Sequence, residues 1–373
     1  MTTRPDDPGL RVQFGKTLLR QGKTEEALEA FRTARKLTSN PDVLATCGRT
    51  LFDYGQYGAA REFLEPAVAA NPSAVDPRLD LAIAVFHSGT AEEALKVLDE
   101  TPPQERTGDY FLLRAQILDA LGKPQEAAQA LNRGFRAAPT RADLYFQAAL
   151  FLIKHNEYQQ AVDLLEQGIQ KLPNVPELWL TQATIYAILR QHDRAQELLT
   201  EIEARWPEWN MPYTIHGIIL TIRRRPQEAE PLLETAITLG AENAVTYFYL
   251  ALARSSDNPP STDKAQKAIE RALQLNPKDA YIQSLAGRIA YLQQDYSTAE
   301  EHLKVALQIW PEMVEAHQTL AGVYRALGER EKSAAELKEI VRIKQANPTA
   351  DQAPPFPVGD LLFTVRPPAR PPS

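Results

Sequence analysis

The side chains of this chain that could bind a metal or carry out acid–base catalysis are its histidines, its one cysteine and its carboxylates. The six histidines are His87, His155, His192, His216, His302 and His317. No HExxH motif or comparable ligand spacing links them. The carboxylates recur as pairs such as Glu25-Glu26 and Glu92-Glu93, which suit the first turn of a helix. We therefore predict no catalytic site, no metal and no cofactor.

Motifs that bind phosphate or activate a nucleophile are also absent from the sequence. It has no Walker loop, no nucleophile elbow and no dinucleotide fingerprint. The single cysteine, Cys47, has no partner for an internal disulfide, and we interpret it as a small core residue rather than a redox group. The chain is thus predicted not to be an enzyme.

The charge balance argues against nucleic acid as a partner. The formal net charge is -7, whereas a generic phosphate binder is expected to be basic or to carry a basic stripe. The one dense cationic cluster is Arg223-Arg224-Arg225, followed by Pro226. We interpret this cluster as a solvated loop tip; the alternative is a docking point for an acidic partner.

The elements that hold these side chains follow a repeated pattern. A small residue recurs every 33 to 36 residues, at Ala27, Ala60, Ala94, Ala127, Ala161, Ala195, Ala229, Ala265, Ala299 and Ser333. A large apolar residue follows four positions after each of them, and another small residue follows seven positions after most. These spacings lie on one helix face. A second small residue twelve positions upstream of most anchors lets two helices approach closely, and the period predicts an array of helical hairpins.

This pattern resembles the tetratricopeptide repeat over nearly the whole chain. Repeat six carries it at Trp179, Ala183, Tyr186, Ala195, Leu199 and Pro207, and repeat nine at Ala286, Gly287, Ala299, Leu303, Ala306 and Pro311. The resemblance implies an all-α fold, a right-handed α-solenoid (superhelix) of about ten helix-turn-helix repeats. It also implies a protein that binds other proteins.

The repeats start near residues 8, 41, 75, 108, 142, 176, 210, 244, 280 and 314 and cover residues 8–347. Residues 1–7 form a short N-terminal segment, and residues 348–373 form a C-terminal tail. Neither segment is long enough to bury the core of a catalytic domain.

Three repeats depart from the pattern. In repeat three, Thr101-Pro102-Pro103 is expected to stop the second helix early and to change the superhelical pitch locally. In repeat eight, two extra residues within 255–260 predict a longer loop between the helices. The last repeat has Ser333 in place of the anchor alanine and Gln345 in place of proline, as is common in terminal repeats.

The resemblance also places a binding groove. In tetratricopeptide solenoids the first helices line a concave groove, into which positions 2, 5, 9 and 12 of each repeat point. The groove residues carried over in this way are Phe146, Leu150, Ile153, Leu180, Thr184, Ile218, Phe248, Leu252, Arg288 and Tyr291, with Lys16, Arg49 and Arg325 at the groove rim. Contiguous apolar residues facing a cavity mark an interaction site. The alternative is that individual side chains only pack against neighbouring first helices.

One known groove chemistry of the family is not matched. The Lys-Asn-Asn-Lys-Arg clamp that grips a chaperone's C-terminal carboxylate is replaced here by Val12, Lys16, Thr46, Arg49, Asp76 and Asp80. The sequence therefore disfavours a chaperone-tail adaptor.

The C-terminal tail changes composition abruptly. Eight prolines from Pro348 onward exclude helix and favour extended or polyproline II structure. Residues 358–365 form an apolar island within it, whose large side chains are Leu361, Leu362, Phe363 and Val365. We predict that the island docks on the end or the groove of its own solenoid, or that it is a linear motif for another protein. A free linker is the remaining alternative.

The composition is that of a folded, soluble chain, with 44% hydrophobic and 24% charged residues. Its apolar stretches are too short to insert in a membrane, and the first residues lack the apolar region of a secretion signal, so we expect a cytoplasmic protein. We predict a bacterial, non-catalytic scaffold that binds a protein or peptide segment in its groove. One alternative is a regulatory or substrate-presenting subunit of a separately encoded enzyme, such as a glycosyltransferase or a secretion apparatus. The other is an envelope assembly factor.

Overall fold

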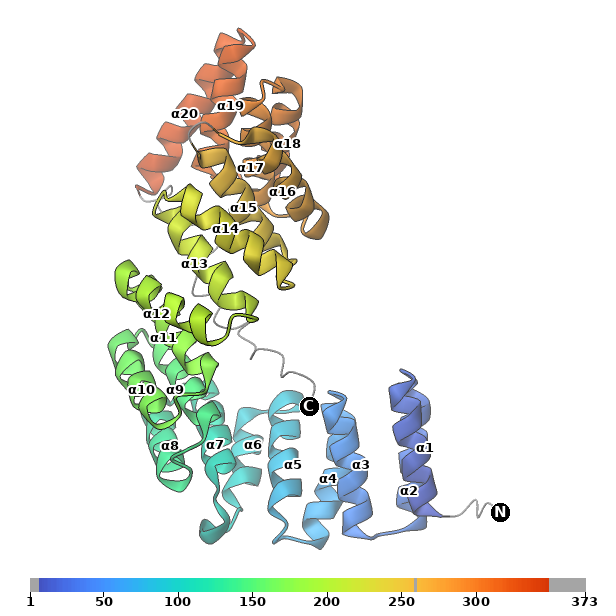
Figure 1. Ribbon diagram of the computed structural model, residues 1–373. Helices are drawn as coiled ribbons and strands as arrows, with labels where there is room; N and C mark the ends of the chain where they lie inside the picture. Colours follow the sequence, from blue (N-terminus) through green and yellow to red (C-terminus); the bar gives the residue numbers. More distant parts are fainter. Residues whose placement is uncertain (1–6, 258–259, 349–373) are drawn as a thin grey trace. The chain divides into compact units, whose positions relative to one another are not determined.

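The computed structural model describes residues 7–257 and 260–348, and every regular element in this part of the chain is a helix. The helices alternate between the first and the second helix of successive hairpins (Figure 1). The first helices are α1 (Pro8–Arg20), α3 (Pro41–Asp53), α5 (Val75–Ser88), α7 (Gly108–Ala120), α9 (Ala142–Lys154), α11 (Pro176–Ile188), α13 (Asn210–Ile222), α15 (Ala244–Ser256), α17 (Ala280–Leu292) and α19 (Val314–Ala326). The second helices are α2 (Thr24–Leu37), α4 (Tyr57–Ala70), α6 (Ala91–Asp99), α8 (Pro124–Ala137), α10 (Tyr158–Lys171), α12 (His192–Arg205), α14 (Pro226–Thr238), α16 (Thr262–Leu275), α18 (Tyr296–Ile309) and α20 (Arg330–Ala346). The predicted all-α class is confirmed.

The chain forms two compact units, Met1–Phe151 and Leu152–Ser373, whose boundary falls inside α9. In the N-terminal unit α2, α4 and α6 pack on the first helices that follow them, and the first helices α1, α3, α5 and α7 contact one another in turn. In the C-terminal unit the first helices α11, α13, α15, α17 and α19 do the same. Each unit is thus a stack of hairpins in which a repeat contacts mainly its neighbours.

The small anchor residues lie where helices meet. All nine anchor alanines have no exposed surface, and Ser333 is buried. The small residue twelve positions upstream faces the large apolar side chain of the same hairpin. A Cβ atom added to Gly217 would lie 2.6 Å from Cγ of Leu233, and one added to Gly48 would lie 2.5 Å from Cγ of Leu64. The two helices of a hairpin therefore approach to a distance that only small residues allow.

Adding one methyl group at this approach should loosen a hairpin. Gly287→Ala in α17 would place a Cβ 2.6 Å from Cγ of Leu303 and 3.1 Å from the carbonyl oxygen of Ala299. We expect a loss of about 1–3 kcal/mol of unfolding free energy in urea, despite the better helix propensity of alanine. The matched control is Gly58→Ala in α4, where the added Cβ meets nothing within 4 Å and should gain about 0.4–1 kcal/mol. Equal stability of the two variants would contradict this packing.

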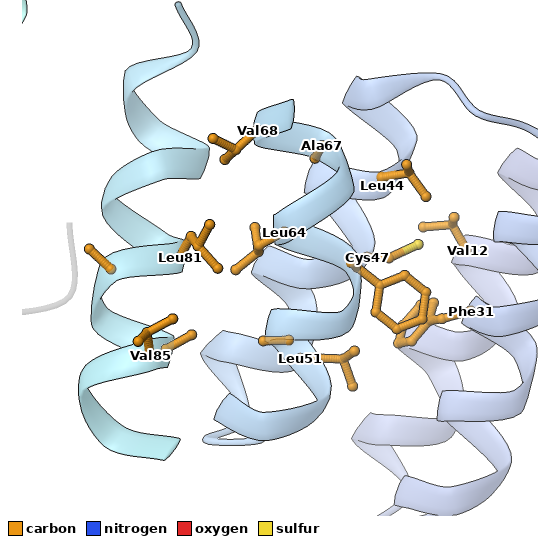
Figure 2. Close-up of a cluster of buried hydrophobic side chains, with 14 of the residues drawn as sticks. Val12, Phe31, Leu44, Cys47, Leu51, Leu64, Ala67, Val68, Leu81 and Val85 are labelled. Carbon is orange, nitrogen blue, oxygen red and sulfur yellow. The ribbon is translucent and has the colours of Figure 1, made fainter. Parts of the chain in front are cut away.

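Side chains from successive hairpins interleave in the core of the N-terminal unit. Figure 2 shows Val12 and Phe31 of the first hairpin beside Cys47 of the second, with Leu64 facing Leu81 of the third. Cys47 is wholly buried as a free thiol, which confirms its interpretation as a core residue. Burial raises the pKa of this thiol to about 12, so it stays protonated and unreactive at neutral pH.

Repeat three ends its second helix early, as the sequence predicts. Helix α6 has 9 residues, whereas α4 and α8 have 14, and a 3-10 turn, η1 (Pro103–Glu105), follows it. The guanidinium of Arg106 compensates for the missing turn by donating to the carbonyl oxygens of Thr101 at 3.1 Å and Asp99 at 3.3 Å. These carbonyls would otherwise lack a partner at the helix end.

The other two departures also have local causes. Helix α15 ends at Ser256 and α16 begins only at Thr262, which confirms the longer connection in repeat eight. In the last repeat the hydroxyl of Ser333 donates to the carbonyl oxygen of Ala321 at 2.9 Å, so the serine satisfies its own polar group while buried. With Gln345 in place of the expected proline, α20 continues for 17 residues and ends at Ala346, two residues before Pro348.

Candidate partner-binding face

The first helices of the N-terminal unit enclose a cavity of about 350 Å³ between α3, α5 and α7. Its lining residues are Arg49, Phe52, Asp76, Leu79, Asp80, Ile83, Asp109, Leu112, Leu113 and Gln116. Most of them stand at positions 2, 5, 9 or 12 of repeats two to four, the positions that the sequence comparison assigned to the groove. Of these residues, Arg49 is a predicted rim residue, whereas Asp76 and Asp80 enter the prediction only as departures from the clamp. The same positional rule, applied to repeats two to four, finds the other lining residues except Leu113, which stands at position 6.

The floor of the cavity is apolar. Phe52, Leu79, Ile83 and Leu112 are half-buried, so each still offers part of its side chain to a partner. The guanidinium carbon of Arg49 lies 5.5 Å from the ring centroid of Phe52, within the range of a cation–π interaction. Half-buried apolar side chains gathered in a concavity are typical of a binding site.

The wall of the cavity is acidic. Asp80 is 6% exposed, and its carboxylate accepts a hydrogen bond from Arg49 Nη1 at 2.7 Å. The same guanidinium also donates from Nε to Asp53 at 3.1 Å. Asp109 pairs with Arg141 at 2.7 Å. One arginine therefore serves two carboxylates on α3 and α5, and within the described residues Asp76 has no ion-pair partner.

Burial raises the pKa of the Asp80 carboxyl above its usual value, against the opposing effect of Arg49, while the nearby charges of Asp53 and Asp76 raise it further. A buried carboxyl whose pKa is raised costs stability when it is ionised.

Asp80→Asn should therefore stabilise the fold at pH 7. Because the pKa of the Asp80 carboxyl is raised on folding, its ionised form disfavours the folded state, and this penalty disappears as the pH falls through the raised pKa. We expect the urea midpoint of the variant to exceed that of the wild type at pH 7, with a difference that shrinks towards acidic pH. Asp42→Asn, at an exposed residue of α3, is the control. A variant that is less stable at pH 7 would show that the pair with Arg49 outweighs the burial.

The predicted apolar stripe of repeats five to eight is less open than its composition indicates. Ile153, Leu180, Thr184, Ile218 and Phe248 are all buried. The helices that carry the last four residues pack on one another, α11 on α13 and α13 on α15, which removes these four side chains from direct contact with a partner. The remaining members of the stripe, Phe146, Leu150 and Leu252, are half-buried, and so are the predicted groove residues Arg288 and Tyr291 of repeat nine. The groove role of the stripe stays a prediction, and these five residues are the ones that could contact a partner.

Two of the predicted polar groove residues link neighbouring repeats. The Arg288 guanidinium donates to the hydroxyls of Ser255 at 3.0 Å and Ser256 at 3.2 Å and pairs with Glu315 at 3.4 Å. Tyr291 lies where a Cβ added to Gly322 would meet its ring at 3.3 Å. Arg288 thus joins α15, α17 and α19.

The rim residues differ in their surroundings. Arg325 is exposed and Lys16 is half-buried, whereas Arg49 lines the cavity. Of the three, Arg49 lines the cavity between α3, α5 and α7.

The cationic cluster is largely engaged in local contacts. Arg223 donates to Asp193 at 2.7 Å and to Gln196 at 2.6 Å, and Arg225 pairs with Glu228 at 2.5 Å. Arg224 occupies the left-handed turn position with φ 57° and is exposed. These contacts favour the solvated loop tip over a docking point.

One recurrent contact was missed by the sequence analysis. At position 4 of five repeats a polar side chain donates to the carbonyl oxygen of the proline six residues earlier. The donors are Arg78, Tyr145, Trp179, Gln283 and His317, and the acceptors are Pro72, Pro139, Pro173, Pro277 and Pro311, at 2.7 to 3.2 Å. This bond ties the first helix of one repeat to the end of the preceding repeat. We name it the repeat-junction hydrogen bond.

Three of the six histidines have hydrogen-bond partners from structural positions of the repeats. His317 makes the repeat-junction hydrogen bond and lies 2.5 Å from Glu336; His216 lies 2.9 Å from Glu203, and His302 lies 2.7 Å from Gln283. In residues 7–257 and 260–348, no group of three or more histidine, cysteine or acidic side chains could hold a metal ion. The tail residues Leu361, Leu362, Phe363 and Val365 lie outside the described residues.

The sequence matches family models of the tetratricopeptide repeat. One such model matches residues 51–117, 118–185 and 290–353, and a second matches residues 261–314. Together they cover more than half of the chain. A search of curated proteins found no match.

Solved structures of similar fold include several repeat proteins. The APC/C hetero-tetramer Cut9–Hcn1 is 15% identical over 95% of this chain and 75% of that chain, with a TM-score of 0.51. PilW, a type IV pilus biogenesis factor, is 18% identical over 57% of this chain and 95% of its own, with a TM-score of 0.49. MamA from Desulfovibrio magneticus RS-1 is 22% identical over 45% of this chain and 94% of its own, with a TM-score of 0.42. The likeness to Cut9–Hcn1 supports the α-solenoid fold. In the described part of the chain, no helix has the length and apolar character to cross a membrane.

Proposed function

Because the chain belongs to the tetratricopeptide-repeat family, we propose that it is a non-catalytic scaffold that binds an extended segment of a partner protein on its first-helix face. The observation that carries this proposal is the cavity between α3, α5 and α7. Three consecutive first helices each contribute apolar side chains to it, and none of these side chains has a role in a catalytic constellation. Such a surface binds by burying apolar area and orients its ligand by a few charges.

The cavity between α3, α5 and α7 is the part of the first-helix face best suited to bind a partner. Phe52, Leu79 and Ile83 offer an aromatic and two aliphatic contacts, the kinds of side chain that dominate interface energies when a partner buries them. The half-buried members of the predicted stripe, Phe146, Leu150 and Leu252, would extend the contact surface in their own repeats.

Site-specific photo-crosslinking tests this proposal. A benzoylphenylalanine at position 52 of the full chain should crosslink in native lysate to a small set of proteins, and mass spectrometry should map each adduct to one short segment. The same probe in place of Leu275, which is 46% exposed on α16, is the control. Adducts of the same proteins in equal yield at both positions, or none at position 52, would contradict a binding role for the cavity.

We also propose that the apolar island of the tail regulates partner binding. If residues 358–365 occupy the groove, deletion of residues 348–373 should strengthen partner binding, because a tethered competitor acts at an effective concentration of about millimolar. If they instead cover the end of the solenoid, the same deletion should lower the melting temperature. Calorimetry and a partner titration on the deleted chain separate these outcomes. A deletion that changes neither would make the segment a linker or an outward-facing motif.

A further inference from the structure

The outer face of the last hairpin is apolar and exposed. Position 24 of every repeat carries a large apolar side chain, and in the nine earlier repeats this side chain is at most 5% exposed. In the last repeat it is Leu337, which is 44% exposed. Val341, one turn further along α20, is 54% exposed, and Ala334, one turn earlier, is exposed as well. These spacings of three and four place the three residues on one face of the helix.

The outer face of the first hairpin has the same character. Phe14 stands at position 7 of α1 and is 53% exposed, and Leu10, one turn earlier, is 54% exposed. The apolar residues at position 7 of later repeats, such as Leu81, are at most 5% exposed. Phe14 lines a hollow of about 460 Å³ between α1 and α2, together with Glu29. Because terminal repeats of a solenoid normally need a polar outer face, two apolar ends call for an occupant.

We propose that the outer face of α20 binds the outer face of the first hairpin of a second copy of this chain, so that copies associate head to tail. This contact repeats the stacking of consecutive hairpins. It joins two molecules and therefore does not depend on the arrangement of the two units within one chain. It also does not rest on the binding role of the cavity between α3, α5 and α7.

The apolar contacts of consecutive hairpins are the first argument. In the N-terminal unit Leu64, at position 24 of the second repeat, faces Leu81, at position 7 of the third (Figure 2). The same stacking between two copies brings Leu337, at position 24 of the last repeat, to Phe14, at position 7 of the first. Both side chains are about half exposed in a single chain, so their burial favours association.

The ion pairs between consecutive hairpins are the second argument. Arg32, at position 25 of the first repeat, pairs with Glu62, at position 22 of the second, at 3.0 Å. Position 25 of the last repeat is Lys338, which is exposed, and position 22 of the first repeat is Glu29. The same stacking therefore brings a cation to a carboxylate across the contact between copies.

Glu29 can take this second cation. It pairs with Arg32 within α2 at 2.9 Å, and its side chain is 69% exposed. Glu62 shows that one carboxylate in this position serves two cations, because it pairs with both Arg32 and Arg35.

Sedimentation velocity tests the proposal. From about 1 µM to about 1 mM, the full wild-type chain should sediment faster as its concentration rises, since a head-to-tail contact joins copies into rings or open chains. Phe14→Glu alters the face of the first hairpin, and Val341→Glu alters the face of α20. Each variant alone should need at least about tenfold more protein to associate. An equimolar mixture of the two should form a 1:1 complex, because each supplies the face that the other lacks.

Charge reversal checks the alignment of the contact. Lys338→Glu and Glu29→Lys should each raise the concentration needed for association by about two- to fivefold, and the chain with both changes should recover the wild-type value. Lys267→Glu, the same reversal at an exposed residue of α16, is the control and should change nothing. Circular dichroism and the urea midpoint check that every variant is folded.

The outcomes distinguish this contact from its alternatives. A full chain that stays monomeric at every concentration overturns the proposal, and if removal of residues 349–373 then permits association, the tail occupies one of the two faces instead. Association that Phe14→Glu leaves unchanged overturns it in favour of a symmetric contact between two α20 helices. A double charge reversal that does not recover association contradicts the hairpin-like alignment. Crosslinking of partner proteins from position 52 is a separate readout, so either proposal can fail without the other.

Discussion

Aspartate in place of both Leu79 and Ile83 should weaken binding of the partner segment by at least about 100-fold. Each substitution removes an aliphatic side chain whose burial contributes about 1.5–3 kcal/mol, and every 1.4 kcal/mol corresponds to about tenfold in affinity. The new carboxylates also stand beside Asp76 and Asp80, so any cationic group is drawn away from the apolar floor. Isothermal titration with the segment identified by crosslinking measures the loss.

Both side chains are half-buried and pack partly against the core of the N-terminal unit, so we expect the chain to fold with a reduced urea midpoint. Circular dichroism at 222 nm and the urea midpoint check this point. Leu275→Asp is the matched control, since it introduces the same group on a second helix at an exposed position. A folded double variant with unchanged affinity would move the binding site away from the cavity of the N-terminal unit.

The fold was accessible from the sequence because its determinants are local and repeated. A helix crossing needs a small residue at a fixed sequence separation from a large one. The spacing of Gly217 and Leu233 in the sequence therefore predicts their contact. The early end of α6 was accessible for the same reason, because the two prolines after Thr101 act on the backbone next to them. The capping of this helix end by Arg106 could not be predicted, because any nearby hydrogen-bond donor could have bound the same carbonyl oxygens.

The site was accessible only in part. Position within the repeat predicts which way a side chain points, but how deeply it is buried depends on how neighbouring first helices pack. Ile218 and Ile83 both stand at position 9, yet Ile218 is buried and Ile83 lines a cavity. Most of the predicted groove residues fall in repeats five to eight, where Leu180, Ile218 and Phe248 are buried.

The repeat-junction hydrogen bond escaped the sequence analysis for a chemical reason. Arginine, tyrosine, tryptophan, glutamine and histidine share no size, charge or hydrophobicity, so a pattern based on residue class does not group them. They share only an N–H or O–H group at the right reach. The proline carbonyl is a recurrent acceptor because proline ends the preceding helix and leaves its carbonyl outside the helical ladder.

Trp179 makes this bond in the C-terminal unit and gives the clearest measure of its contribution. Its indole Nε1 donates to the carbonyl oxygen of Pro173 at 3.1 Å, and its ring is 9% exposed. The ring centroid lies 6.4 Å from that of Trp206, and the guanidinium carbon of Arg205 lies 4.4 Å from the ring centroid of Trp179. Trp179 therefore combines a buried hydrogen bond with aromatic packing between α11 and α12.

We expect Trp179→Ala to lower the unfolding free energy by about 3–5 kcal/mol, because it leaves a large cavity. Trp179→Phe keeps most of the packing and leaves the Pro173 carbonyl without its donor, so we expect a loss of about 1–3 kcal/mol. Urea unfolding measures both values, and Gln191→Ala in the turn before α12 is the surface control. Because repeats contact mainly their neighbours, hydrogen exchange should rise most in α10, α11 and α12. If the phenylalanine variant is as stable as the wild type, the repeat-junction hydrogen bond contributes nothing to holding consecutive repeats together, and packing of the ring alone accounts for the preference for a large residue at position 4.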